Sequence, residues 1–212
     1  MTGALGGFLL SVFKNEYVAT VFVSMFPLIE LKGAIPIGTG LFGLKLWQTA
    51  SIAYLGSTLI AIAVFFLLIP IFNLLKKIGF VKKLIVKIES IFEDKARKIA
   101  DKTDGSAERE AKKIMMLSLF IFVAVPFPVT GVWTGTAIAV FLGLKFRESV
   151  LPIALGNLIA GSIITLLTFL VGEYVDVIIY MLFAIAILML VIFVAKIVLA
   201  KTPEKEENTE KQ

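Results

Sequence analysis

Long apolar stretches follow one another along most of this chain. Three of them carry almost no charge and occupy residues 47–75, 147–171 and 177–200. A helix that crosses the hydrocarbon core of a bilayer needs about 20 consecutive apolar residues, and each stretch reaches that length. The hydrophobic pattern therefore predicts three transmembrane helices at these positions.

Two further apolar blocks, 17–44 and 114–144, are interrupted near their centres by proline and glycine. Proline removes a backbone donor and glycine permits turns, so neither block can be one regular helix. Irregular backbone is tolerated at membrane depth only where protein or water covers it. We expect both blocks to be re-entrant segments that return to the face they entered from; the alternative is that they cross fully.

An internal repeat links these elements. The residues LFGLKL at 41–46 are matched by FLGLKF at 141–146, and in both copies a broken block precedes a long span. If both blocks are re-entrant, each half crosses once and the halves form an inverted repeat, as in many transporters. If the blocks cross, the repeat is parallel. The predicted fold is thus all-α and polytopic, with two re-entrant-plus-span repeats and an additional C-terminal transmembrane helix.

Three segments lie outside this repeat. Residues 1–16 form an apolar N-terminal segment, and the charged tail at 201–212 lacks the apolar residues needed to fold. The linker at 76–113 has more basic than acidic residues and apolar positions at helical spacing. We predict an amphipathic helix on the cytoplasmic side of the inner (cytoplasmic) membrane. It is either a solvated connection or a surface for anionic lipid headgroups.

Composition narrows the chemistry. The chain is 58% hydrophobic and only 17% charged, whereas soluble domains carry about a quarter charged residues. It contains no Cys and no His, so we expect no metal, no cofactor and no catalytic residues. The net charge of +5 is concentrated in the linker without a nucleic-acid motif, so we expect no nucleic-acid partner.

Glu30 is the single acid of the first broken block, where a charged group at the bilayer centre costs about 2.5 to 3.5 kcal/mol. One hypothesis is that Glu30, together with Lys32, couples proton movement to transport or binds a cation. The other is a structural role: an ion pair with Lys32 or with a basic residue of the other half, or simply an interfacial position. Positions two apart do not face each other on a helix, so a local pair requires unwound backbone. The turn-forming candidates around this pair are Pro27, Gly33, Pro36 and Gly38.

The second broken block has no charge but offers hydroxyls, an indole and turn-forming residues, and freed backbone at a half-helix end can meet an anion. Its candidates for the substrate site or turn are Pro126, Pro128, Thr130, Gly131, Trp133, Thr134 and Gly135. Trp133 is alternatively an interfacial anchor. Arg147 is either a surface partner of Glu148 or a phosphate ligand. Asn157 is expected to join helices.

Two segments carry a family resemblance: ELKGAIPIG at 30–38 and PFPVTGVWTG at 126–135. The second resembles the Pro-Leu-Pro-Gly-Thr-Gly-x-Trp-Thr-Gly signature of the bacterial and archaeal small multidrug export family, and departs from it at Phe127 and Val129. That family in turn looks like a relative of the DedA membrane proteins. The resemblance implies paired re-entrant loops and proton-linked translocation of a small molecule or lipid carrier.

These observations together predict a membrane transporter for proton-coupled export or translocation of a small molecule. A DedA-like flippase or scramblase of a phosphate-bearing lipid carrier and a non-transporting scaffold are the alternatives. The expected partners are membrane lipids, with anionic headgroups at the linker, and a small-molecule or lipid substrate. The sequence leaves a homo-oligomer open.

Overall fold

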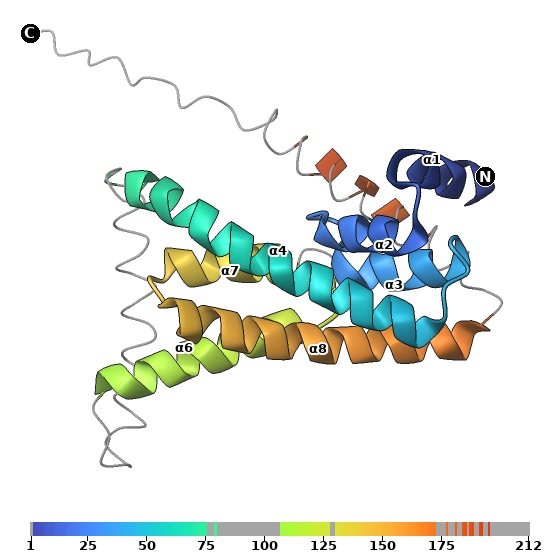
Figure 1. Cartoon of the computed structure of the whole chain (residues 1–212). Coiled ribbons are helices and arrows are strands. Elements are labelled where there is room, and N and C mark those ends of the chain that lie inside the picture. The colour runs from blue at the N-terminus through green and yellow to red at the C-terminus, as the bar shows by residue number, and fades with distance from the viewer. Residues whose placement is uncertain are drawn as a thin grey trace, which may run out of the picture.

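The computed structural model describes residues 2–75, 107–127 and 130–172, together with Gly79 and isolated positions from 177 to 195. Most of the linker, the expected C-terminal span at 177–200 and the tail lie outside these residues. Every element in the described part is a helix (Figure 1). The helices are α1 (Thr2–Phe13), α2 (Glu16–Met25), α3 (Glu30–Gly40), α4 (Leu46–Leu75), α6 (Ala107–Ala124), α7 (Val132–Phe141) and α8 (Phe146–Val171).

The two longest helices match two of the expected spans. α4 and α8 are the described helices that are individually long and apolar enough to cross a membrane. A third span results if Gly6–Phe13 and Glu16–Met25, which meet at an angle of 103°, are counted as one bent segment. By length and composition, the described residues therefore provide two or three crossings.

Each broken block folds as a helical hairpin. α3 packs back along α2, where a Cβ on Gly38 would lie 3.1 Å from Thr20 Oγ1. α7 packs back along α6, where Gly135 faces Val123. The chain turns at residues 26–29 in the first hairpin, and residues 125–127 and 130–131 are the described part of the turn in the second. We call these the two tips. α6 begins at Ala107, so the expected boundary between linker and block at 113/114 lies inside a helix.

The two halves, α2–α3–α4 and α6–α7–α8, repeat the same local geometry. Gly43 and Gly143 end the short helices with φ of 69° and 70°, a left-handed conformation that favours glycine. The amide of Lys45 then donates to Gln48 Oε1 at 3.3 Å, and the amide of Lys145 donates to Glu148 Oε2 at 2.8 Å. The matched segments at 41–46 and 141–146 thus form the same turn before each long helix.

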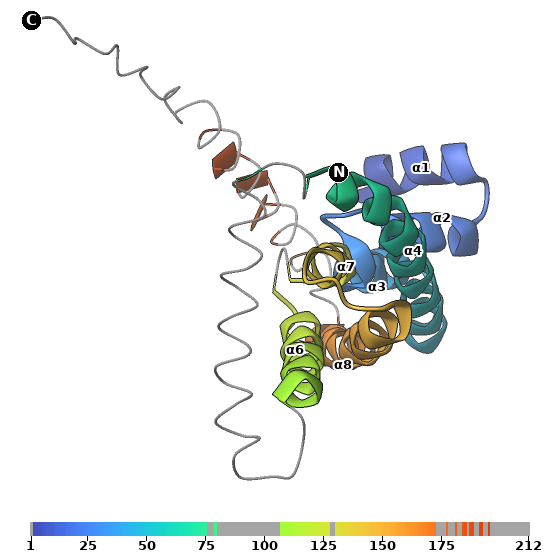
Figure 2. The ribbon, with the colours of Figure 1, turned by 90° about the vertical axis from the view of Figure 1, so that its left-hand side faces the viewer.

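α4 and α8 cross in opposite directions (Figures 1 and 2). Near the end of α4, the ring of Phe66 stacks on Phe146 at the start of α8, with centroids 5.3 Å apart. Midway along both helices, Asn157 Nδ2 donates to Ser57 Oγ at 2.6 Å and to Thr58 Oγ1 at 3.1 Å. The prediction that Asn157 joins helices is confirmed.

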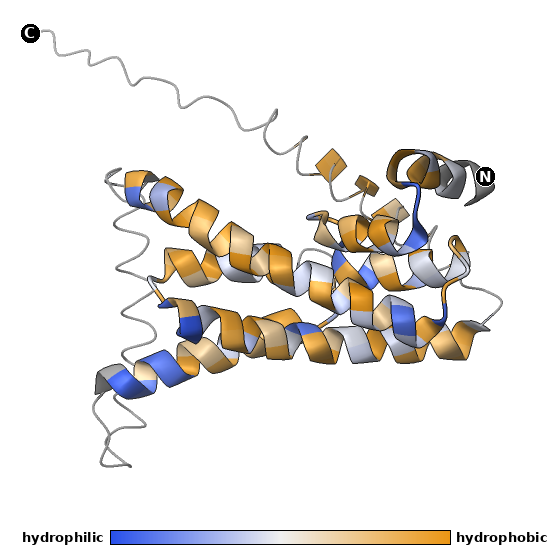
Figure 3. Ribbon diagram, viewed as in Figure 1, coloured by the Kyte–Doolittle hydropathy of each residue, from blue (hydrophilic) through white to orange (hydrophobic). Residues whose placement is uncertain are grey.

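The outer surface of the long helices is apolar. Figure 3 shows hydrophobic residues along most of α4 and α8, with hydrophilic ones at the starts of these helices and of α2, α3 and α6. Large side chains such as Leu59, Leu67, Leu166 and Phe169 are more than half exposed. A soluble protein rarely exposes so much contiguous apolar surface, whereas lipid is a suitable solvent for it.

Candidate functional site at the two hairpin tips

The tips of the two hairpins meet beside the middle of the long helices. Leu31, which follows the first tip, contacts α8 so closely that a Cβ on Gly161 would lie 3.1 Å from its Cδ1. Three side chains then link one tip to the other: Glu30, Lys32 and Trp133. The structure thus brings the two broken blocks into one site, and the residues in it come from both halves.

Glu30 binds the N-terminus of α7. The amide of Trp133 donates to Glu30 Oε1 at 3.2 Å, and the Glu30 residue is only 5% exposed. The first amides of a helix have no partner within the helix and carry a partial positive charge. The N-cap position of α7 is Gly131, which has no side chain to accept them. A carboxylate from the first half therefore caps a helix of the second half.

Gly131 makes room for that carboxylate. A Cβ at this position would overlap the carboxyl group of Glu30. Its φ of −162° is extended and open to any residue, so the requirement for glycine here comes from close approach and not from backbone conformation.

Lys32 binds the loop before α7. Its ammonium group lies 3.4 Å from Glu30 Oε2, donates to the carbonyl of Phe127 at 3.0 Å and also donates to the carbonyl of Thr130. The Thr130 hydroxyl donates to Val125 O at 2.7 Å and accepts from the Phe127 amide at 3.2 Å, which closes the loop. Lys32 is thus held by main-chain oxygens of the opposite half.

The backbone conformation of Glu30 allows an ion pair between Glu30 and Lys32, which do not face each other on a regular helix. Glu30 has a φ of 50°, in the left-handed region that a non-glycine residue seldom adopts. Such a conformation costs about 1 to 3 kcal/mol and is held only by strong surrounding contacts. The first residue of α3 thus departs from helical geometry, and the ion pair between Glu30 and Lys32 considered from the sequence is present.

Trp133 links the tips a second time. Its indole Nε1 donates to the carbonyl of Met25 at 2.9 Å. Met25 is the last residue of α2, where carbonyls have no partner within the helix. The half-buried indole of Trp133 therefore provides a donor for a carbonyl of the first hairpin that has no partner within its helix. The main-chain amide of the same residue binds Glu30.

The remaining candidates divide into three groups. Pro36 and Gly38 are buried in α3, Gly33 lies in its first turn, and Gly135 packs α7 on α6. Pro27 is exposed at the first tip, Pro126 is half-buried at the second, and Thr134 Oγ1 accepts from the Gly131 amide at 3.1 Å. Pro128 lies outside the described residues.

Arg147 is not brought to the tips. It is exposed in the first turn of α8, whereas the tips lie near Gly161. The separation between these two positions is about 21 Å along the axis, at about 1.5 Å per residue. Any role of Arg147 is therefore separate from the Glu30 and Lys32 site.

Sequence reasoning missed the carbonyls of Met25 and Phe127. Main-chain oxygens carry no residue signature, and the signal that could have located the second one is the run of prolines around Phe127. Within the described residues, no group of three or more His, Cys, Asp or Glu could hold a metal ion. The site offers paired charges, main-chain donors and main-chain acceptors.

Across the described part of the chain, Glu30 and Lys32 are the charged residues that are buried, while the long helices expose apolar side chains. This combination defines a membrane protein. Residues 30–163 match the family model described as "Putative small multi-drug export protein", and the chain belongs to this family. The expected family is thereby confirmed. No match was found among curated proteins or among solved structures.

Proposed function

We propose that this protein is a membrane transporter that exports or translocates a small molecule, with Glu30 as the proton-coupling residue. The family description refers to export. The observation that carries the proposal is the contact between the two tips. Glu30 and Lys32, a buried acid and base of the first half, pair with each other and also bind main-chain atoms of the second half.

The arrangement of helices supports an inverted repeat of two re-entrant hairpins. α4 and α8 run in opposite directions, and the N-termini of α3 and α7 meet where Glu30 contacts Trp133. Both hairpins turn back beside the middle of these long helices. Transporters with inverted repeats place substrate and coupling sites at such a position, between broken helices.

Coupling follows from the charge of Glu30. While ionised, its carboxylate is attracted by the amides of α7 and by Lys32. A proton on Glu30 removes that charge, weakens both attractions and favours separation of the tips. Alternating access then consists of the two halves parting and rejoining around this site, with one proton gained and lost.

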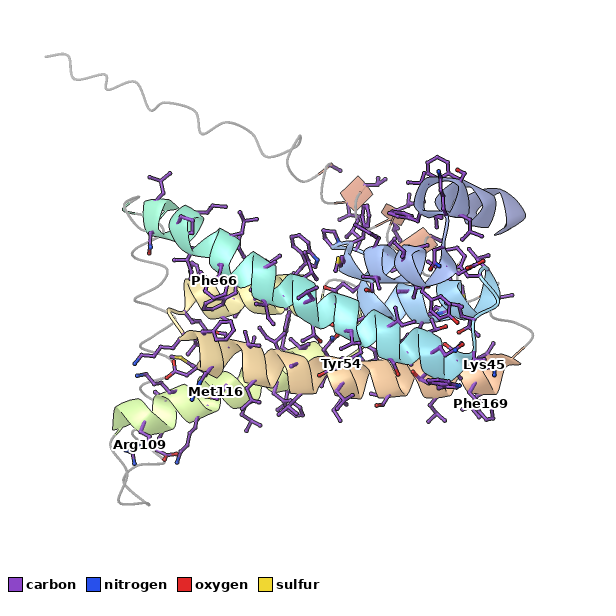
Figure 4. The ribbon with its side chains drawn as sticks, in the orientation of Figure 1. Lys45, Tyr54, Phe66, Arg109, Met116 and Phe169 are labelled. Carbon is purple, nitrogen blue, oxygen red and sulfur yellow. The ribbon has the colours of Figure 1, made fainter. Side chains whose placement is uncertain are left out.

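α6 and α8 begin at the same end of the molecule, where Figure 4 labels Arg109. Lys113 lies in the same part of α6, and Lys145 and Arg147 lie at the start of α8. Basic residues flanking transmembrane helices are enriched on the cytoplasmic side. We therefore assign this end, and the linker that precedes α6, to the cytoplasmic face of the cell membrane.

The test is Glu30→Gln in proteoliposomes. Glutamine keeps the size of the side chain but binds no proton. With ethidium as the probe, we expect the wild type to show flux that depends on an imposed pH gradient and the variant to lose that dependence. Glu110→Gln is the matched control, because Glu110 pairs with Lys113 in α6, away from the tips. A gradient dependence that is unchanged in Glu30→Gln overturns the coupling role.

The other functions considered from the sequence predict different results. A flippase of a phosphate-bearing lipid carrier would gather its headgroup with Arg147, and the place of Arg147 far from the tips gives this no support. A scaffold predicts no flux of any probe. We assign no catalytic role to the site.

A further inference from the structure

We infer that α7 moves to open and close the molecule at the end that we assign to the cytoplasm. The contact between Phe72 of α4 and Phe141 of α7, which we call the gate, closes that end. This inference rests on the proposed transport function and names the element that opens the path. The two halves share one framework but place their short helices differently, and this difference carries the inference.

The framework of the two halves consists of α2 with α4 and of α6 with α8. A Cβ on Gly56 of α4 would lie 2.1 Å from Ser24 Oγ of α2. A Cβ on Gly156 of α8 would lie 3.1 Å from the amide nitrogen of Ala124 of α6. In the register of the repeat, these two contacts occupy matched positions. The two halves of the framework are therefore packed alike.

The short helix α3 lies inside its own half. Its residues from Glu30 to Gly38 are buried. A Cβ on Gly38 would lie 2.5 Å from Thr49 Cγ2 of α4 and 3.1 Å from Thr20 Oγ1 of α2. The framework of the first half thus encloses the short helix that lies between α2 and α4 in the sequence.

The short helix α7 packs mainly on the opposite half. It contacts α4 more extensively than it contacts α6 or α8. Ala61 of α4 belongs to the same hydrophobic cluster as Val132 and Ala139 of α7. Ile138, which matches the enclosed Gly38, is 38% exposed. In the described part of the chain, α6 and α8 therefore leave one side of α7 uncovered.

Aromatic rings join α7 to the opposite half at one end of the molecule. The ring of Phe72, near the end of α4, meets the ring of Phe141, the last residue of α7, with centroids 5.8 Å apart and planes at 74°. Rings in this geometry attract each other beyond the area that they bury. The matched residues at the other end are Gly172 and Leu41, which have no ring. The two ends are therefore closed by unequal contacts.

The residues that flank α7 allow it to move as a unit. Gly131 precedes the helix, and Gly143 follows it with a φ of 70°. A helix of 10 residues between two glycines can change its direction without changing inside, because glycine accepts a wide range of backbone angles. The place that α7 can reach is the one that α3 has in the first half, between the two helices of its own framework. Ile138 is then covered.

The charge of Glu30 determines where α7 lies. The carboxylate binds the first turn of α7 through the amide of Trp133, while the gate binds its last residue. Among the described residues, Lys32 is the charged side chain that pairs with Glu30. A proton on Glu30 weakens the contact at the start of α7, so that the rings alone oppose its movement. We expect the gate to open when Glu30 is protonated and to close when it is ionised.

The experiment joins the gate with a reversible link. The chain has no cysteine of its own, so Phe72→Cys with Phe141→Cys supplies one pair of thiols. A short bifunctional thiol reagent that contains a disulfide should join them, since the two rings meet. In proteoliposomes, we expect joining to lower gradient-driven ethidium flux to the level of empty vesicles. Reduction of the disulfide in the reagent should restore the flux.

The matched control is Phe13→Cys with Phe22→Cys. These two rings stack with centroids 4.7 Å apart and connect α1 to α2, so a link between them leaves α7 free. The same reagent should join this pair without changing the flux. Loss of flux in both joined proteins, or full flux through the protein joined at the gate, overturns the inference.

The rate of joining measures the movement of α7 without transport. In detergent micelles, the reagent should join the gate pair severalfold more slowly in a Glu30→Gln background, because the neutral amide binds the start of α7 less strongly. The pair at positions 13 and 22 should react at the same rate in both backgrounds. Equal rates for the gate pair overturn the link between Glu30 and α7.

A single substitution keeps the inference testable if the gate pair does not fold. N-ethylmaleimide should modify Ile138→Cys more slowly in the Glu30→Gln background, where α7 lies in its own half and covers position 138. Leu59→Cys, on an exposed face of α4, should react equally in both backgrounds. Unchanged modification at position 138 overturns the inference.

The two proposals fail separately. Absence of flux of any probe through the wild type overturns the transport function, while the rates of joining still test the movement of α7. Gradient-driven flux that continues through the protein joined at the gate overturns the gate and leaves the transport function in place.

Discussion

The indole Nε1 of Trp133 donates a hydrogen bond to the carbonyl of Met25 at 2.9 Å, and so joins the start of α7 to the end of α2. The same residue binds Glu30 through its main-chain amide. One residue of the second half thus satisfies both a helix end and a buried acid of the first half.

Trp133→Phe should destabilise the tip contact. Phenylalanine keeps an aromatic ring but removes the donor, so the Met25 carbonyl loses its partner at a cost of about 1 kcal/mol or more. We expect a lower unfolding temperature in detergent micelles. Trp47→Phe is the matched control because Trp47 is 66% exposed, and its unfolding temperature should stay that of the wild type. Equal effects of the two substitutions would show that the Trp133 bond adds nothing.

Gly131→Ala should displace the Glu30 carboxylate. The added methyl group would occupy the space of the carboxyl group, and overpacking of a tight site costs about 1 to 3 kcal/mol. Gly7→Ala is the control, since a Cβ there meets nothing within 4 Å. Combining Gly131→Ala with Glu30→Gly should cost less than the sum of the two single substitutions, because glycine at position 30 removes the group that the new methyl group would overlap. Additive losses in the combined variant would contradict the contact.

Lys32→Met should be more harmful alone than together with Glu30→Gln. Removing one member of a buried pair leaves an unpaired charge and costs about 3 to 5 kcal/mol, whereas removing both charges costs less. Unfolding free energies of the two single variants and the double variant measure this coupling. The corresponding cycle on Lys113 and Glu110, where the lysine is 63% exposed, should give about 0 to 1 kcal/mol. A coupling as small at Lys32 as at Lys113 would refute the prediction.

The opposite directions of α4 and α8 can be tested by cross-linking, because the chain has no cysteine of its own. Cysteines in place of Phe66 and Phe146 should be joined by a short bifunctional thiol reagent, since their rings stack. After cleavage at a protease site inserted in the linker, the two halves should then stay together on a denaturing gel.

The control pair is Phe66 with Phe169. Both are exposed, and they lie towards opposite ends of the molecule (Figure 4). The same reagent should leave this pair unjoined. Cross-linking of the control pair in place of the Phe66 and Phe146 pair would reverse the helix direction that we describe.

Much of the fold could be predicted because its signals are local. The spans at 47–75 and 147–171 come from uninterrupted apolar runs, and the turns at Gly43 and Gly143 come from a sequence match. The family also follows from two short motifs. The link to the DedA proteins stays a prediction, as does the inverted, re-entrant topology.

The details of the site could not be predicted because they depend on contacts between distant parts of the chain. The sequence indicates Glu30 and Lys32 as a buried acid and base, but their partners are main-chain atoms, which look alike at every position. The charged residues at 109–113, assigned to the linker, continue as a helix into the apolar block, because a change of polarity along the sequence does not by itself end a helix. Arg147 was named for its chemistry, and only the fold shows its distance from the tips.

The hydrogen bond from Asn157 to Ser57 lies midway along two crossed helices and has a mechanical consequence. If α4 and α8 rotate against each other, atoms near the crossing point move least and atoms at the ends move most. Phe66 lies about 13 Å along α4 from Ser57, so a small rotation that leaves the amide-to-hydroxyl bond intact separates the stacked rings of Phe66 and Phe146. The two helices would thus pivot at the crossing, and the distance between the rings of Phe66 and Phe146 would measure how far they have rotated.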